Sequence, residues 1–162
     1  MNSKISSDIF QSTKKEISNL MNFFVKEGSH EITIPALLNS DILLDLYGED
    51  LHARAYTVLD PVRGNLMLRP DFTVPVVQMH MSEGNKHLSK SYCYSGTVWR
   101  KQEQDSLRPS EYVQVGVEFF GGKNKVNDDA KLLSLMLKSL DGLPVDIATG
   151  DLGVILSIIN NL

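Results

Sequence analysis

Apolar residues near the start of the chain recur every three or four positions, which is the spacing of one face of an α-helix. They are Phe10, Ile17, Leu20, Met21, Phe24 and Val25. Ser6 and Ser7 precede them as capping residues, and Gly28 follows where a helix end favours glycine. The pattern therefore predicts an amphipathic first helix that ends near Gly28.

Two segments in the middle of the chain alternate between apolar and polar residues, with the period of two that is typical of β-strands. They are residues 91–100 and 111–120, and a polar stretch that contains Pro109 separates them. Gly121 and Gly122 end the second segment. The pattern therefore predicts two long strands joined by a loop over 101–110.

The remaining expected elements are short. Strands are predicted over 31–34, where Pro35 stops the strand, and over 53–59, 66–69 and 144–148. Helices are predicted from Ser40 and Asp41 to 46, over 72–81, after Asn127 as an N-cap, and over 152–162. Hairpins interleaved with helices, without βαβ alternation, indicate one α+β domain over residues 1–162, an antiparallel sheet with helices on one side.

Composition narrows the function classes. The chain has 16 Lys and Arg residues against 20 Asp and Glu residues, a net charge of −4, and it shows no basic stripe, so we expect no nucleic-acid partner. The N-terminus lacks a signal-peptide core, and no apolar run is long enough to span a bilayer. We therefore expect a cytoplasmic protein without a membrane partner.

Metal and redox chemistry also find little support in the sequence. Cys93 is the single cysteine, which leaves no pair for an internal disulfide and argues against a zinc site. The histidines share no metal-ligand spacing, and we expect them at the surface or as caps. They are His30, His52, His80 and His87. We expect no metal and no cofactor.

The two long strands carry the candidate chemistry. One face of the second strand is an apolar stripe that we expect to face the core: Val113, Val115, Val117 and Phe119. Its other face is Tyr112, Gln114, Gly116 and Glu118, and the first strand repeats the arrangement with Tyr92, Tyr94, Gly96, Val98 and Arg100. A glycine inside a strand marks close approach of another group. If the strands pair, the shared face suits a small ligand with an ammonium and a carboxylate group. A sheet with one solvated face explains the alternation equally well.

A second constellation lies at the end of the predicted strand 66–69. Arg69, Pro70 and Asp71 are followed by Thr73 near the start of a predicted helix. On composition alone, we favour Asp71 or Thr73 as the N-cap of that helix.

These segments together resemble a known family. Residues 94–100 (Tyr-Ser-Gly-Thr-Val-Trp-Arg) and 108–118 (Arg-Pro-Ser-Glu-Tyr-Val-Gln-Val-Gly-Val-Glu) resemble motif 2 of class II aminoacyl-tRNA synthetases in its histidyl form. Residues 68–73 resemble the amino-acid-binding segment of that family, and residues 31–37 resemble motif 1, its dimer-forming element. The resemblance implies a class II synthetase-like fold and a homodimer formed through motif 1.

The resemblance also implies roles for five residues. Asp71, Thr73 and Gln114 would hold the α-amino group of histidine, and Glu118 would face the imidazole ring. Arg100 matches the motif 2 arginine, which contacts the α-phosphate of ATP and the carboxylate in the synthetases. No residue is expected to be catalytic.

Departures from the synthetase pattern favour the regulatory subunits of ATP phosphoribosyltransferase, which are relatives of histidyl-tRNA synthetase. Gln102 stands where the synthetases carry a glutamate that binds adenine, and Asp71 stands where they carry another glutamate. Residues 108–111 resemble the Arg-Pro-Arg-Glu of the regulatory subunits, with Ser110 in place of an arginine. We expect the chain to contain only the N-terminal part of the synthetase-like catalytic core, with motifs 1 and 2. Motif 3 and the anticodon-binding domain are expected to be absent from it.

The resemblance then implies a non-catalytic subunit that binds the short form of ATP phosphoribosyltransferase as a hetero-oligomer. With histidine as effector, it would serve the first step of histidine biosynthesis and its feedback control. One alternative is a truncated or split histidyl-tRNA synthetase that activates histidine with ATP. Another is a histidine-binding module with an unrelated partner.

Overall fold

The structure is a computed structural model that describes residues 2–40, 53–84, 88–148 and 150. Its elements, in chain order, are α1 (Asn2–Lys26), β1 (His30–Glu31), β2 (Leu37–Asn39), β3 (Thr57–Asp60), β4 (Gly64–Leu68), α4 (Thr73–Ser82), β5 (Lys90–Trp99), β6 (Glu111–Phe120) and α5 (Lys125–Ser139). The predicted helices at 41–46 and 152–162 lie outside the described residues.

Two three-stranded sheets organise the described part of the chain. The main sheet has the order β1-β5-β6, and the smaller sheet has the order β2-β4-β3. The smaller sheet is antiparallel, and β5 pairs antiparallel with β6. In contrast to the antiparallel expectation, β1 runs parallel to β5. The α+β class is confirmed, but the main sheet is mixed.

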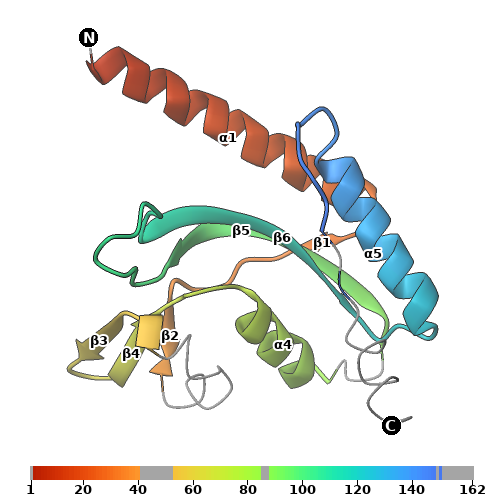
Figure 1. Ribbon diagram of the computed structural model, residues 1–162. Coiled ribbons are helices and arrows are strands. Elements are labelled where there is room, and N and C mark those ends of the chain that lie inside the picture. Colours follow the sequence, from red (N-terminus) through yellow and green to blue (C-terminus); the bar gives the residue numbers. More distant parts are fainter. Residues whose placement is uncertain (1, 41–52, 85–87, 149, 151–162) are drawn as a thin grey trace, which may run out of the picture.

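Helices lie on both sides of the main sheet, whereas the sequence predicted them on one side. Figure 1 shows α1 and α5 over one face, and α4 with the smaller sheet over the other. On the first face, Met21 and Phe24 of α1 pack against Cys93, with Val115 and Val117 beside them. The sheet is therefore a central layer, and the alternative of a sheet with one solvated face is wrong.

The two faces of the long hairpin differ from expectation in their burial. The stripe predicted to face the core is only partly covered, because Val113 and Phe119 are 44% and 42% exposed. The opposite face holds the more buried cluster, in which Tyr92, Tyr94 and Val98 pack against α4. The face with the candidate polar residues is therefore also a core face.

The end of α1 forms as predicted. Gly28 has a φ of +98°, which glycine adopts without steric cost. The amide of Gly28 donates to the carbonyl of Val25, and the amide of Ser29 donates to that of Phe24, both over 3.0 Å. This pair of bonds is the Schellman motif, which satisfies the last carbonyls of a helix.

Several predicted boundaries are wrong. The strand predicted over 53–59 begins only at Thr57, and β2 was not anticipated. The N-cap of α5 is Asn124, not Asn127, because the Asn124 side chain accepts a hydrogen bond from the Asn127 amide. Residues 144–148 form no strand. The long elements 91–100 and 111–120 match β5 and β6 to within one residue.

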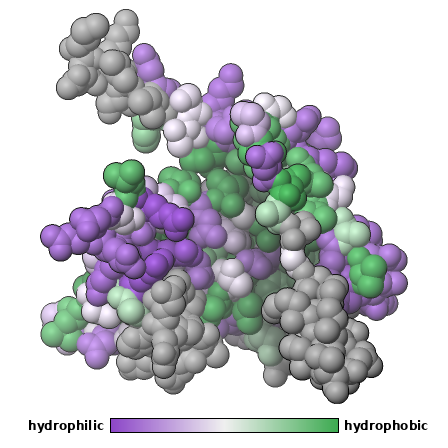
Figure 2. Space-filling view, in the orientation of Figure 1, coloured by the Kyte–Doolittle hydropathy of each residue, from purple (hydrophilic) through white to green (hydrophobic). Residues whose placement is uncertain are grey.

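Surface hydropathy follows this arrangement. Figure 2 shows mostly polar side chains over the end of the molecule where the loop between β5 and β6 lies. Four apolar side chains of α5 are exposed: Val126, Leu133, Met136 and Leu137. Over the parts of the chain that the structure describes, we find no helix with the length and apolarity needed to cross a lipid bilayer.

Candidate functional site

The pairing of β5 with β6 places the candidate residues on one face, as the sequence predicted. Directly opposite partners share a face of a sheet. The register pairs Tyr92 with Glu118, Tyr94 with Gly116, and Gly96 with Gln114. Gln114 and Glu118 are four residues apart on β6, which is about 13 Å along a strand. The face is therefore long enough for a ligand of amino-acid size.

Glu118 connects this face to α4. Its Oε1 accepts a hydrogen bond from the Thr73 hydroxyl over 2.8 Å and another from the Tyr94 hydroxyl over 3.2 Å. Thr73 is the first residue of α4, and Phe72 occupies the N-cap position without a side-chain capping bond. The expectation that Asp71 or Thr73 caps the helix is therefore wrong, and the Thr73 hydroxyl faces the candidate site instead.

Arg100 and Asp71 form the other charged part of the site. Nε of Arg100 donates to the Pro70 carbonyl over 2.7 Å, which anchors the guanidinium beside the start of α4. Its Nη2 lies 4.0 Å from Oδ2 of Asp71, a distance too long for a hydrogen bond. The two groups therefore attract each other as charges, and both side chains are partly exposed.

The side chain of Gln114 contains an unsatisfied hydrogen-bond acceptor. Its Oε1 is buried and has no hydrogen-bond partner among the described residues. Leaving a buried acceptor unsatisfied costs about 1–3 kcal/mol. A ligand that donates an N–H group to this oxygen would remove that cost, and an ammonium group is such a donor.

The two central glycines do not leave the gap that the sequence suggested. A Cβ at Gly116 would lie 2.5 Å from the Tyr94 hydroxyl oxygen. A Cβ at Gly96 would lie 2.7 Å from Nη2 of Arg69 and 3.0 Å from Cζ of Phe72. Protein side chains, not a ligand, therefore occupy the space above both glycines.

Tyr94 is the residue whose role sequence reasoning missed. Its ring is buried and stacks on Phe72 with 4.2 Å between centroids. Burial, the nearby charge of Glu118 and the hydrogen bond to Glu118 raise the pKa of Tyr94. The phenol therefore stays protonated and donates to Glu118. The signal was present in the alternation, since Tyr94 shares a face with Gly96 and Glu118.

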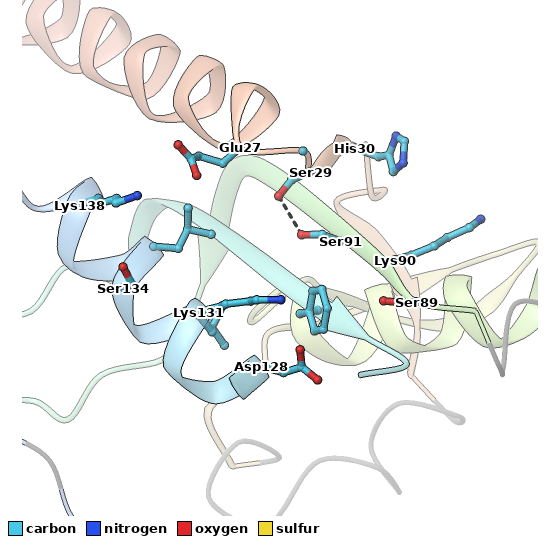
Figure 3. A pocket seen from close by; sticks show the side chains of 14 residues that line it. Glu27, Ser29, His30, Ser89, Lys90, Ser91, Asp128, Lys131, Ser134 and Lys138 are labelled. Atoms are coloured by element: carbon cyan, nitrogen blue, oxygen red, sulfur yellow. Dashed lines mark hydrogen bonds between the residues drawn. The ribbon is translucent and has the colours of Figure 1, made fainter. Parts of the chain in front are cut away.

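A cavity of about 470 Å³ lies on the opposite face of the main sheet. Figure 3 shows it between the end of α1, the start of β5 and α5, with Lys131 and Asp128 on one wall. Ser29 and Ser91 meet there, with 2.8 Å between their hydroxyl oxygens. None of the five predicted site residues lines this cavity, so it is separate from the candidate site.

The histidines and acidic residues form no metal site in the described part of the chain. The expectation of surface histidines is wrong for His80, which is buried. Its Nδ1 lies 3.1 Å from the Tyr92 hydroxyl oxygen, and its ring stacks on Phe120. His30 is exposed, and His52 and His87 lie outside the described residues.

Comparison with known proteins places the chain in a family. The family model described as histidyl-tRNA synthetase matches residues 8–162. The chain belongs to the histidyl-tRNA synthetase family.

Curated relatives of the chain are named as regulatory subunits of ATP phosphoribosyltransferase. It is 29% identical over 147 residues to the ATP phosphoribosyltransferase regulatory subunit of Allorhizobium ampelinum, covering 88% of this chain and 38% of that protein. It is 32% identical over 127 residues to the protein of that name from Brucella ovis, covering 76% and 33%. A crystal structure of an ATP phosphoribosyltransferase regulatory subunit/histidyl-tRNA synthetase from Bacillus halodurans matches with a TM-score of 0.70 and 25% identity, covering 84% and 35%. The chain thus spans about a third of the length of these relatives.

Gln102 is one of the positions where the sequence resemblance marks a departure from the synthetases, and the structure shows what this side chain contacts. Its Nε2 donates to the carbonyls of Arg100 and Pro109, each over 3.4 Å. The Arg100 amide also donates to the Ser110 carbonyl over 2.8 Å. A glutamate carboxylate at 102 has no N–H to give those carbonyls. Gln102 therefore contributes two long hydrogen bonds at the base of the loop between β5 and β6.

Proposed function

We propose that the chain is a non-catalytic regulatory subunit of ATP phosphoribosyltransferase that binds histidine on the face shared by β5, β6 and the start of α4. The names of its relatives and its membership of the histidyl-tRNA synthetase family support this proposal. The observation that carries the histidine site is the buried, unpartnered oxygen of Gln114 on a face that also holds two carboxylates and an arginine.

Each group of histidine has a matching group on this face. The ammonium would donate to Gln114 Oε1 and to the Asp71 carboxylate, with the Thr73 hydroxyl beside them. The carboxylate would lie against Arg100, whose guanidinium is already anchored by Pro70. The imidazole would donate to Glu118. In this arrangement every charged group of the ligand meets an opposite charge or a dipole.

Glu118 has room for this additional bond. Thr73 and Tyr94, its two donors among the described residues, both use Oε1. An ionised carboxylate has about four acceptor positions over its two oxygens. An imidazole N–H can therefore reach Glu118 without displacing either donor, and the two existing bonds fix the direction of the carboxylate in advance.

The proposed partner is the short-form catalytic subunit of ATP phosphoribosyltransferase, whose activity this subunit would tune to the histidine concentration. The test is titration calorimetry with histidine, on the chain alone and on its mixture with that catalytic subunit, and alanine serves as the control ligand. We expect histidine to bind at least in the mixture and alanine to bind more weakly. No histidine binding in either setting would overturn the sensor function.

A second candidate function is histidine activation by ATP, because the matching family model is described as histidyl-tRNA synthetase. The role of Gln102 in the loop supports the regulatory function over this one, since it replaces an acidic adenine contact. We expect no histidine-dependent exchange of pyrophosphate into ATP above a blank without protein. Exchange that Arg100→Ala abolishes would favour the synthetase instead.

A further inference from the structure

Arg69 is a buried arginine just beyond the end of β4. It is 5% exposed, and its guanidinium donates to backbone carbonyls from two other parts of the chain. Nη2 donates to Thr97 over 2.8 Å, and Nη1 donates to Ile34 and, over 3.4 Å, to Pro35. Burial lowers the pKa of Arg69. Burying a charge is costly, and these carbonyls supply hydrogen bonds to the guanidinium but no opposite charge.

The guanidinium also forms one end of a stack that reaches the candidate site. Cζ of Arg69 lies 3.9 Å from the centroid of the Phe72 ring. The Tyr94 ring stacks on Phe72 at 4.2 Å and an interplanar angle of 8°. Because two groups at such distances cannot share one face of a ring, Phe72 lies between Arg69 and Tyr94. The Tyr94 hydroxyl then donates to Glu118.

We propose that Arg69 is a positioning residue for the histidine site: it clamps Phe72 against Tyr94 and thereby fixes the hydroxyl that orients Glu118. This inference rests on the proposed function, because it assigns the residue that sets the geometry of the same site. Arginine suits the task since its planar fork reaches several carbonyls while its flat face lies on an aromatic ring. Lysine keeps the charge but offers neither the fork nor the flat face.

Gly96 provides a second way to disturb the same stack without touching Arg69. A Cβ at this position would lie 2.7 Å from Nη2 of Arg69 and 3.0 Å from Phe72. Neither neighbour can move away freely, because Arg69 is tied to the carbonyls and Phe72 is held between two groups. Gly96→Ala should therefore displace the Arg69 guanidinium and the Phe72 ring by steric contact, with Arg69 itself unchanged.

The first measurement needs no ligand. In protein labelled with 3-fluorotyrosine, the ¹⁹F resonance of Tyr94 is assigned by its loss in Tyr94→Phe. We expect Arg69→Lys and Gly96→Ala to shift or broaden that resonance. Arg63→Lys changes an exposed arginine, and Gly150→Ala adds a Cβ where no atom of the described residues lies within 4 Å. Both controls should leave the Tyr94 resonance in place.

The second measurement is the dissociation constant for histidine, taken by calorimetry under the conditions in which the wild-type chain binds. Changes along a packed network alter coupled binding by about 2-fold to 30-fold, and we expect Arg69→Lys and Gly96→Ala to weaken histidine within this range. If Arg69 acts through Glu118, Arg69→Lys in a Glu118→Gln background should have less than a twofold further effect. If Arg69 only stabilises the fold, Arg69→Lys should instead weaken histidine binding by the same factor in the wild-type and the Glu118→Gln backgrounds.

The outcomes separate this inference from the proposed function. If the wild-type chain binds no histidine, the proposed function fails, and the Tyr94 resonance still decides whether Arg69 positions Tyr94. An unshifted resonance in both variants, or full additivity with Glu118→Gln, overturns the positioning role. Failure of both variants to fold while both controls fold would assign the stack to stability of the fold and would also overturn it.

Discussion

The Thr73 hydroxyl donates to Oε1 of Glu118 over 2.8 Å, which ties the first residue of α4 to β6. The two residues are 45 positions apart in the chain. Glu118 is held a second time by Tyr94, so its carboxylate has a fixed direction before any ligand arrives. Preorganisation of this kind lowers the cost of binding. The predictions below follow from this geometry.

Glu118→Gln should weaken histidine binding about tenfold to a hundredfold, because a hydrogen bond to a charged group contributes about 1.5–3 kcal/mol. Glutamine keeps a carbonyl oxygen for Thr73 and Tyr94, so the change removes mainly the charge that faces the imidazole. Alanine binding should change much less. Calorimetry with both ligands measures the difference, and Glu111→Gln on the exposed end of β6 is the matched control. Equal losses for both ligands would contradict the proposed contact with the ring.

Asp71→Asn should weaken histidine and alanine by similar factors, because Asp71 would hold the ammonium group that both share. We expect a loss of about tenfold to a hundredfold for each ligand. The exposed Asp141, whose change to Asn should have no effect on either ligand, serves as the control. Loss confined to histidine would move Asp71 to the ring side of the site.

Alternation along residues 91–100 and 111–120 was sufficient to predict both long strands and the set of residues on their shared face. It was not sufficient to predict what covers that face. The period of two reports only which residues share a face, whereas the cover comes from α4 and Phe72, which lie far away in sequence. For the same reason the glycines were misinterpreted. Gly116 and Gly96 make room for Tyr94 and Arg69, and the packing of those side chains has no local signal.

Short elements were harder to predict because two residues can satisfy the same local rule. Asn124 and Asn127 are both acceptable N-caps, and the extended backbone at Asn124 decides in its favour. The N-terminus of α4 offers two polar cap candidates, Asp71 and Thr73, yet Phe72 occupies the cap position and the Thr73 hydroxyl bonds to Glu118 instead. Tertiary contacts therefore decide what local propensity leaves open.

The chain should form a homodimer through the segment that resembles motif 1, residues 31–37, with the region around residues 32–38 buried between the two copies. Leu37 is 36% exposed in the single chain and would be buried by the second copy. Leu37→Asp should therefore shift the assembly toward monomer, since it places a charge in an apolar contact. Leu59→Asp is the matched control, because Leu59 lies in the same small sheet and is 78% exposed. Light scattering at high micromolar concentration measures both. A wild-type monomer would contradict the prediction.

Stability at high pH should depend on Tyr94. Its pKa in the folded chain is raised above the ordinary value of about 10, so the folded state keeps a proton that the unfolded state loses. The contribution is fully present below pH 10 and is lost as the pH rises further, with a slope of up to about 1.4 kcal/mol per pH unit. Urea unfolding between pH 8 and 11 should show a steeper loss above pH 10 for the wild type than for Tyr94→Phe. Parallel curves would mean that the tyrosine titrates normally in the folded chain.

Gly116→Ala should destabilise the fold, because its Cβ would lie 2.5 Å from the Tyr94 hydroxyl oxygen. Tyr94 cannot retreat easily, since Phe72 stacks on its ring and Glu118 accepts from its hydroxyl. Overpacking at such a position costs about 1–3 kcal/mol. The free energy of unfolding in urea measures this cost. Gly150→Ala adds the same methyl group where the described residues place no atom within 4 Å, and it should change little. Combining Gly116→Ala with Tyr94→Leu removes the hydroxyl and ring edge that the methyl group meets. The methyl group should then cost much less than it does beside tyrosine. A methyl group that costs as much beside leucine as beside tyrosine would show that Tyr94 is not what requires glycine at this position.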